Sequence, residues 1–105
     1  MVWVTDKSPK FRKKIDEPVV LVSKIFTFEH YRVFVVLNKA SDGFYDVVLK
    51  SKDRITILTI KKKLGIDSSI ILDNDDFYQI VFDTFSTRDD AYEIFYQLGD
   101  MILDD

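Results

Sequence analysis

The chain has 105 residues and no cysteine, which is enough for one domain and excludes disulfides, thiolate metal sites and cysteine nucleophiles. A hydrophobic fraction of 47%, with 9 Phe and 5 Tyr, predicts an apolar core, and only 3 Gly and 2 Pro argue against disorder of the whole chain. The net charge of −3 conceals a division: residues 1–63 carry 14 basic and 7 acidic side chains (14 − 7 = +7), and residues 64–105 carry 1 basic and 11 acidic ones (1 − 11 = −10). This division predicts one basic and one acidic surface.

The sequence gives no sign of a membrane or secretory protein. No stretch approaches the ~20 apolar residues that span a bilayer, and the start, Met1–Asp6, lacks the basic and then apolar layout of a signal peptide. We therefore expect a cytoplasmic protein with no membrane span. Ile, Lys, Asp and Phe are abundant while Ala, Gly and Pro are scarce, which is typical of an AT-rich genome such as that of a virus or an archaeon.

Residues 1–17 contain five basic side chains and little periodicity, and they predict an exposed N-terminal arm ahead of a single domain, residues 18–105. From Val19 onward the chain is rich in β-branched and aromatic residues, as strands are. The expected strands are Val19–Phe28, Tyr31–Asn38, Phe44–Lys50, Ile55–Ile60 and Phe77–Phe85, with a short apolar run at Ile70–Leu72.

The connections between these strands predict an antiparallel sheet. The loops within Tyr31–Ile60 are too short for parallel crossovers, and Asp42-Gly43 supplies the positive φ that a hairpin turn needs. Residues Lys61–Ser69 are expected to form a loop or a single helical turn that ends at Gly65.

The C-terminal segment has the pattern of an amphipathic helix. Ser86 or Thr87 is the expected N-cap, and Asp89 or Asp90 lies three residues later, in the position of a capping box. The residues expected to face the core follow helical spacing: Ala91, Ile94, Phe95, Leu98, Met101 and Ile102.

Together these elements predict an α+β fold: a bent, roll-like antiparallel meander of five to seven strands, with one C-terminal amphipathic helix packed on it. The order of the elements resembles the pleckstrin-homology superfold and, more loosely, the small single-stranded-DNA-binding proteins of the transcription-coactivator and Whirly type. The resemblance lies in element order alone, so it carries no functional residue with it.

The expected C-terminal helix has a second apolar stripe beside the one that faces the core. Its members are Tyr92, Tyr96, Gly99 and Leu103, and they widen the apolar arc to roughly 220°, about twice what one core-facing side needs. The stripe is explained by packing within the chain, for example on a strand around Trp3, or by a homodimer formed through this helix.

The first functional hypothesis is binding of single-stranded nucleic acid by a basic, aromatic sheet surface, because cations meet phosphates and bases stack on exposed rings. The expected phosphate contacts are Arg12, Lys13, Lys14, Arg32, Lys50, Lys61, Lys62 and Lys63, and the expected stacking rings are Tyr31 and Tyr45. The alternative is that the rings belong to the core and the lysines only keep the sheet edges soluble.

The second hypothesis is a protein-interaction module or a viral-type inhibitor that binds a basic protein through its acidic helix. Helical spacing places Glu93, Gln97, Asp100 and Asp104 on one face, with Asp90 at its margin. The alternative is a solvated helix face without a partner. A third, weaker hypothesis is binding of anionic lipid by the basic residues.

No motif in the chain predicts catalysis, a metal or a cofactor. Asp73-Asn74-Asp75-Asp76 resembles half of a calcium loop, but Tyr78 and Thr84 stand where that loop needs its glycine and its final glutamate. His30 is the only histidine and has no nucleophile or ligand near it in the sequence. We therefore expect a noncatalytic binding protein.

Overall fold

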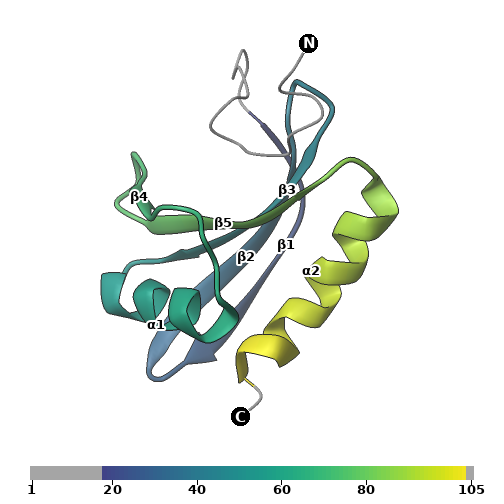
Figure 1. Ribbon diagram of the computed structural model, residues 1–105. Helices are drawn as coiled ribbons and strands as arrows, with labels where there is room; N and C mark the ends of the chain where they lie inside the picture. The colour runs from purple at the N-terminus through teal and green to yellow at the C-terminus, as the bar shows by residue number, and fades with distance from the viewer. Residues whose placement is uncertain (1–17, 104–105) are drawn as a thin grey trace.

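The computed structural model describes residues 18–103, in which five strands form one antiparallel sheet that carries two helices (Figure 1). The strands are β1 (Val19–Phe28), β2 (Tyr31–Lys39), β3 (Tyr45–Ser51), β4 (Ile71–Leu72) and β5 (Tyr78–Phe85), and the helices are α1 (Arg54–Leu64) and α2 (Arg88–Leu103). The strand order is β1-β2-β3-β5-β4, so the sheet is open and its edges are β1 and β4. The predicted α+β class, with an antiparallel sheet and a C-terminal helix packed on it, is confirmed.

Both hairpin turns contain residues with positive φ, and the second forms at the Asp42-Gly43 loop that the sequence indicates. Glu29 and His30 connect β1 to β2 with φ values of 49° and 81°, and positive φ at both residues defines the turn that suits a two-residue hairpin loop. Gly43 takes a φ of 90° in the loop between β2 and β3, where the Phe44 amide donates to the Asp42 carboxylate at 3.0 Å. These turns fix the register of β1, β2 and β3.

Residues Ile55–Ile60, expected as a strand, lie in helix α1, so residues 18–103 contain two helices where one was expected. The Asp53 carboxylate caps the helix by accepting from the Thr56 amide at 3.0 Å and from the Thr56 hydroxyl at 2.8 Å. The helix ends at Gly65, whose left-handed φ of 67° brings its amide to the carbonyl groups of the last turn. The β-branched residues favoured a strand, but the two caps and the buried face of α1 decide for a helix.

The core lies between one face of the sheet and both helices. Its fully buried side chains come from alternate residues of β2 and β3, from β5, and from α1 and α2; the largest are Leu37, Leu49, Ile57, Ile60, Ile80, Phe95, Leu98 and Ile102. Strand alternation puts the neighbouring residues Phe34, Val36, Val48 and Lys50 on the opposite face. Of the predicted core stripe of α2, Ile94 is half-buried and Met101 is exposed, because the helix turns a narrower side to the sheet than expected.

Candidate interaction surfaces

Three of the lysines expected to contact phosphates are hydrogen-bonded within the fold. Lys61 Nζ donates to the carbonyl groups of Ile66 and Ser68 at 2.7 and 2.8 Å, which holds the loop after α1. Lys63 Nζ donates to the Ile102 carbonyl at 2.6 Å and so ties α1 to the end of α2. Lysine side chains satisfy helix C-terminal carbonyl groups in this way. These ammonium groups hold elements of the fold together.

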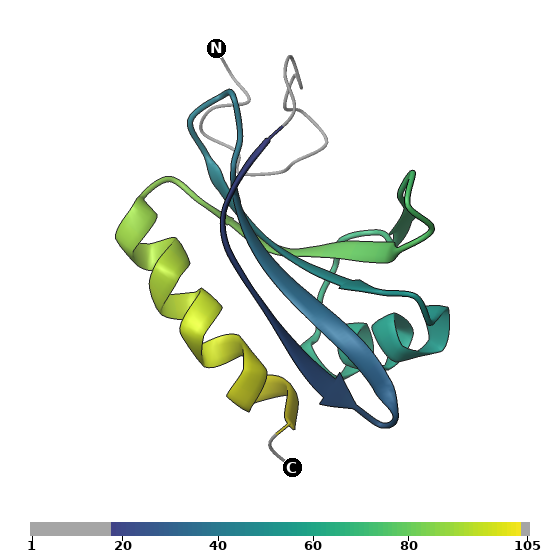
Figure 2. The ribbon, with the colours of Figure 1, turned by 180° about the vertical axis from the view of Figure 1, so that it is seen from behind.

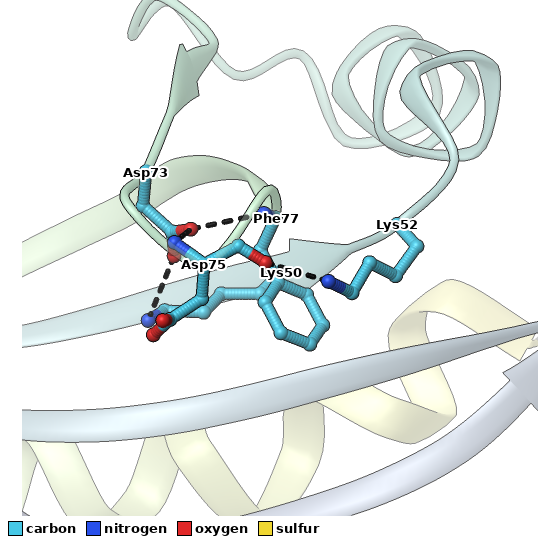
Figure 3. A network of polar contacts seen from close by, with 5 residues as sticks. All are labelled: Lys50, Lys52, Asp73, Asp75 and Phe77. Carbon is cyan, nitrogen blue, oxygen red and sulfur yellow. Dashed lines mark hydrogen bonds and ion pairs between the residues drawn. The ribbon is translucent and has the colours of Figure 1, made fainter.

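Lys50, the third of these lysines, lies on β3 and contacts the turn between β4 and β5 (Figure 3). Its ammonium lies 3.4 Å from a carboxylate oxygen of Asp73, whose other oxygen accepts from the Asp75 and Phe77 amides at 2.9 Å each. Burial raises the pKa of Asp73, but the two amide hydrogen bonds and the Lys50 charge outweigh it, so the pKa lies below its ordinary value. The carboxylate is thus used by its own turn.

The same turn is fixed by a second lysine and two aromatic rings. Lys52 Nζ donates to the Asp75 carbonyl at 2.6 Å and lies 4.4 Å from the centre of the Phe77 ring (Figure 3). The Phe77 ring in turn meets Phe34 edge to face, with 5.2 Å between centroids. Within residues 18–103 no group of three or more acidic or histidine side chains is placed to hold a metal ion. The acidic turn therefore has a structural role.

The remaining residues of the predicted nucleic-acid site come from β2, β3 and α1. Arg32 and Tyr31 are exposed at the start of β2, and Lys62 is exposed on α1. Tyr45 is half-buried against the core, with Lys39 Nζ 5.9 Å from its ring centre. Arg12, Lys13 and Lys14 lie outside the described residues. Of the two rings predicted to stack, Tyr31 is therefore the exposed one.

The outer side of α2 carries acidic and apolar residues together. We define the α2 ridge as Asp89, Glu93, Tyr96, Asp100 and Leu103, which helical spacing places along one side of the helix and all of which are exposed. Tyr96 is 61% and Leu103 50% exposed, although both are large apolar side chains. The Tyr96 ring is supported by Phe95, edge to face at 5.3 Å, and by Tyr92 at 6.1 Å.

The acids of the α2 ridge differ from Asp73 of the β4–β5 turn in having no ion-pair partner among the described residues. None of the three carboxylates forms an ion pair or a side-chain hydrogen bond with any residue from 18 to 103. The nearest basic residue along the helix, Arg88, lies over the Tyr92 ring at 5.2 Å. The ridge therefore presents negative charge and apolar area to the solvent side by side.

The predicted interface stripe on α2 is divided between the inside and the outside of the molecule. Thr87 begins the helix as expected, accepting from the Asp90 amide at 3.4 Å. Tyr92 packs against the core, and Gly99 is half-buried beside Lys24, whose ammonium would lie 3.6 Å from an added Cβ. Lys24 Nζ also donates to the Tyr96 carbonyl at 3.4 Å. Tyr96 and Leu103 are the members of the stripe that remain available to a partner.

Sequence reasoning missed Lys24 as the contact of β1 with α2. Its ammonium lies 5.0 Å from the centre of the Phe95 ring, and its side chain occupies the space that Gly99 leaves open. The sequence signal was the single charged residue of β1, together with a glycine in the C-terminal helix. The place that Gly99 offers to a second backbone is thus taken by a side chain of the same chain.

No protein-family model matches the chain, and neither the curated proteins nor the solved structures include a significant match to it. In the part of the chain that the structure describes, neither helix combines the length and the apolar character that crossing a membrane requires.

Proposed function

We propose that the protein is a noncatalytic interaction module that binds a basic, partly apolar segment of a partner protein on the α2 ridge. The observation that carries this proposal is the combination of three acids that form no ion pair with residues 18–103 and two exposed apolar side chains on the same side of one helix. Tyr96 supplies a rigid aromatic contact of the kind that dominates binding energies at interfaces. Asp89, Glu93 and Asp100 attract and orient a cationic partner around it.

The chemistry of the ridge favours a protein over a nucleic acid as the partner. Phosphates would be repelled by the three carboxylates, whereas lysine and arginine side chains of a partner would be attracted to them. Lys50, Lys61 and Lys63 already donate to groups of their own chain, so phosphate binding there competes with contacts that hold the fold. Binding of single-stranded nucleic acid through Arg32, Lys62 and Tyr31 stays a prediction, and the experiment below separates it from the proposal.

The test is a direct titration with defined probes at physiological ionic strength. The probes are a fluorescent amphipathic peptide of alternating Lys and Leu, a Lys and Ser peptide of equal charge, and a single-stranded oligonucleotide. The Lys and Leu peptide is expected to bind more tightly than the Lys and Ser peptide, because Tyr96 and Leu103 bury its apolar side chains. Its affinity is also expected to fall with added salt, because exposed charges are screened.

Charge-reversed variants locate the binding surface. The double variant Glu93→Lys with Asp100→Lys is expected to lose at least about tenfold in affinity for the Lys and Leu peptide. The matched control is Glu29→Lys with Asp67→Lys, which makes the same change in net charge at exposed acids away from α2 and is expected to bind as the unmodified protein does. Equal losses in both double variants would show that only net charge matters and would refute a site on α2.

A further inference from the structure

The two edges of the sheet differ in how well they are protected against pairing with another strand. The β4 edge is only two residues long, and shortness is a common protection. The β1 edge is ten residues long and can be followed along its whole length in Figure 2, and among the described strands it pairs with β2 alone. A long free edge presents a row of unpaired backbone donors and acceptors, so β1 is the edge that another strand can extend.

The hairpin turn determines which backbone groups of β1 point outward. Phe28 and Tyr31 flank the two-residue loop and pair with each other, so their amide and carbonyl groups face one another. In an antiparallel strand these directions alternate, so Phe26 and Lys24 also point inward to β2. The groups that point to the free edge therefore belong to Ser23, Ile25 and Thr27.

The side chains of these three outward-pointing residues are also unprotected. Ser23, Ile25 and Thr27 are all exposed on the face of the sheet opposite the helices, and Ile25 is 56% exposed. The one charge in β1, on Lys24, is directed to the other face, where it binds the Tyr96 carbonyl. Over Ser23–Thr27 the edge thus lacks the outward charge, the proline and the bulge that usually block pairing.

A second copy of the same strand is complementary to this segment. An antiparallel pair related by a twofold axis at Ile25 places Ile25 opposite Ile25, Ser23 opposite Thr27, and Lys24 opposite Phe26. Such pairs stabilise a sheet, and no like charges meet. The register also brings the outward amide and carbonyl groups of each strand directly opposite those of the other.

We propose that the protein forms a symmetric dimer in which β1 pairs antiparallel with β1 of a second copy across Ser23–Thr27, joining two five-stranded sheets into one. This interface is separate from the α2 ridge, so each copy keeps its ridge accessible. A strand-edge contact is a small interface, so we expect the dimer to form only at roughly micromolar or higher protein concentrations.

The experiment measures mass and amide hydrogen exchange of the protein over a concentration series from about 1 μM to about 1 mM, a range chosen to span weak association. The average mass is expected to rise from that of one chain, 12.3 kDa, toward twice that value. Amides of Ser23, Ile25 and Thr27 are expected to become protected as the dimer forms. Amides of Lys24 and Phe26 are expected to be protected at every concentration, because they are bonded to β2.

Two isoleucine substitutions supply the matched comparison. Ile25→Lys places two cations opposite each other at the twofold axis and is expected to raise the dimer dissociation constant at least about tenfold. Ile71→Lys changes an isoleucine that is likewise 56% exposed, but on the β4 edge, and is expected to leave dimerisation unchanged. Circular dichroism checks that both variants are folded.

Three results would overturn the dimer. The mass could stay at one chain up to about 1 mM, the top of the range for weak complexes. Protection of the Ser23, Ile25 and Thr27 amides could be independent of concentration, which would point to the chain's own residues as the cover of this edge. Self-association could also persist undiminished in Ile25→Lys, which would place the interface elsewhere. The exchange pattern of the unmodified protein decides the matter even if a variant fails to fold.

Discussion

The β4–β5 turn and the α2 ridge are both acidic, but they use their carboxylates in opposite ways. In the turn, the Asp73 carboxylate accepts hydrogen bonds from two backbone amides and forms an ion pair with Lys50, so its charge is paired within the molecule. On the ridge, Glu93 and Asp100 have no such donors within residues 18–103. The comparison teaches that the charge division along the chain survives folding on α2 and is lost at the turn, where a lysine from β3 meets an aspartate from the acidic half.

The largest expected effect is on the free energy of unfolding and concerns Phe95, whose buried ring packs against Tyr96 of the ridge. Phe95 is 1% exposed and Tyr96 is 61% exposed, although they are neighbours on α2. Phe95→Ala is expected to lower the free energy of unfolding by about 3–5 kcal/mol, because it leaves a cavity in the core. Tyr96→Ala is expected to change the free energy of unfolding by less than about 0.5 kcal/mol. It is also expected to lower the affinity for the Lys and Leu peptide. Urea unfolding measures the first effect; a Tyr96→Ala variant as unstable as Phe95→Ala would show that the ridge is structural.

The next effect compares the two kinds of acid directly. Asp73→Ala is expected to lower the free energy of unfolding by about 1–3 kcal/mol, because the Asp75 and Phe77 amides and Lys50 lose their acceptor. Asp100→Ala removes an exposed carboxylate with no described donor and is expected to stay within about 0.5 kcal/mol. The measurement is again urea unfolding, and equal losses for the two variants would remove the distinction between turn and ridge.

A neighbouring pair of lysines sharpens the same distinction on the basic side. Lys61→Met keeps most of the aliphatic stem but takes the donor from the Ile66 and Ser68 carbonyl groups, and is expected to cost about 1 kcal/mol. Lys62→Met, on the exposed side of the same helix, is expected to have no measurable effect on stability. Thermal unfolding followed by circular dichroism compares them, and a larger loss in Lys62→Met would contradict the described contacts.

The smallest expected effect is on the pH dependence of stability. The pKa of Asp73 is lower in the folded chain than its ordinary value of 3.8, so the folded state binds this proton less readily than the unfolded state. Its contribution to stability is therefore complete above the unfolded pKa and is lost as the pH falls through the lower, folded value. Asp73→Asn is expected to flatten the acid limb of a stability profile below about pH 4. An unchanged acid limb would show that other carboxylates account for it.

Much of the fold follows from short signals in the sequence. The Asp42-Gly43 loop and the Thr87 cap each specify local backbone geometry, and the elements around them form where expected. Helix α1 was missed because Ile55, Ile57 and Ile60 are β-branched and typical of strands. Asp53 and Gly65 are caps at the right distance, and they were the better guide.

The candidate interaction surfaces were harder to predict, for a physical reason. Helical spacing, which the sequence contains, places Tyr96 and Leu103 on one stripe with Tyr92 and Gly99, but only tertiary packing decides which of them stay exposed. The acceptors of Lys50, Lys61 and Lys63 are a distant carboxylate and backbone carbonyl groups, which depend on tertiary packing and leave no pattern in the sequence. A basic residue in a sequence is therefore available to a ligand only where its charged group is not already hydrogen-bonded within the folded chain.

The most direct test of the account is an NMR map of where the basic peptide binds. Titration of the labelled protein with the Lys and Leu peptide is expected to shift amides of residues 89–103 first, with the largest changes around Glu93, Tyr96 and Asp100. A single-stranded oligonucleotide is expected to leave these amides unchanged. Peptide shifts confined to the β4–β5 turn, or oligonucleotide shifts centred on Tyr31, Arg32 and Lys62 with none from the peptide on α2, would contradict it.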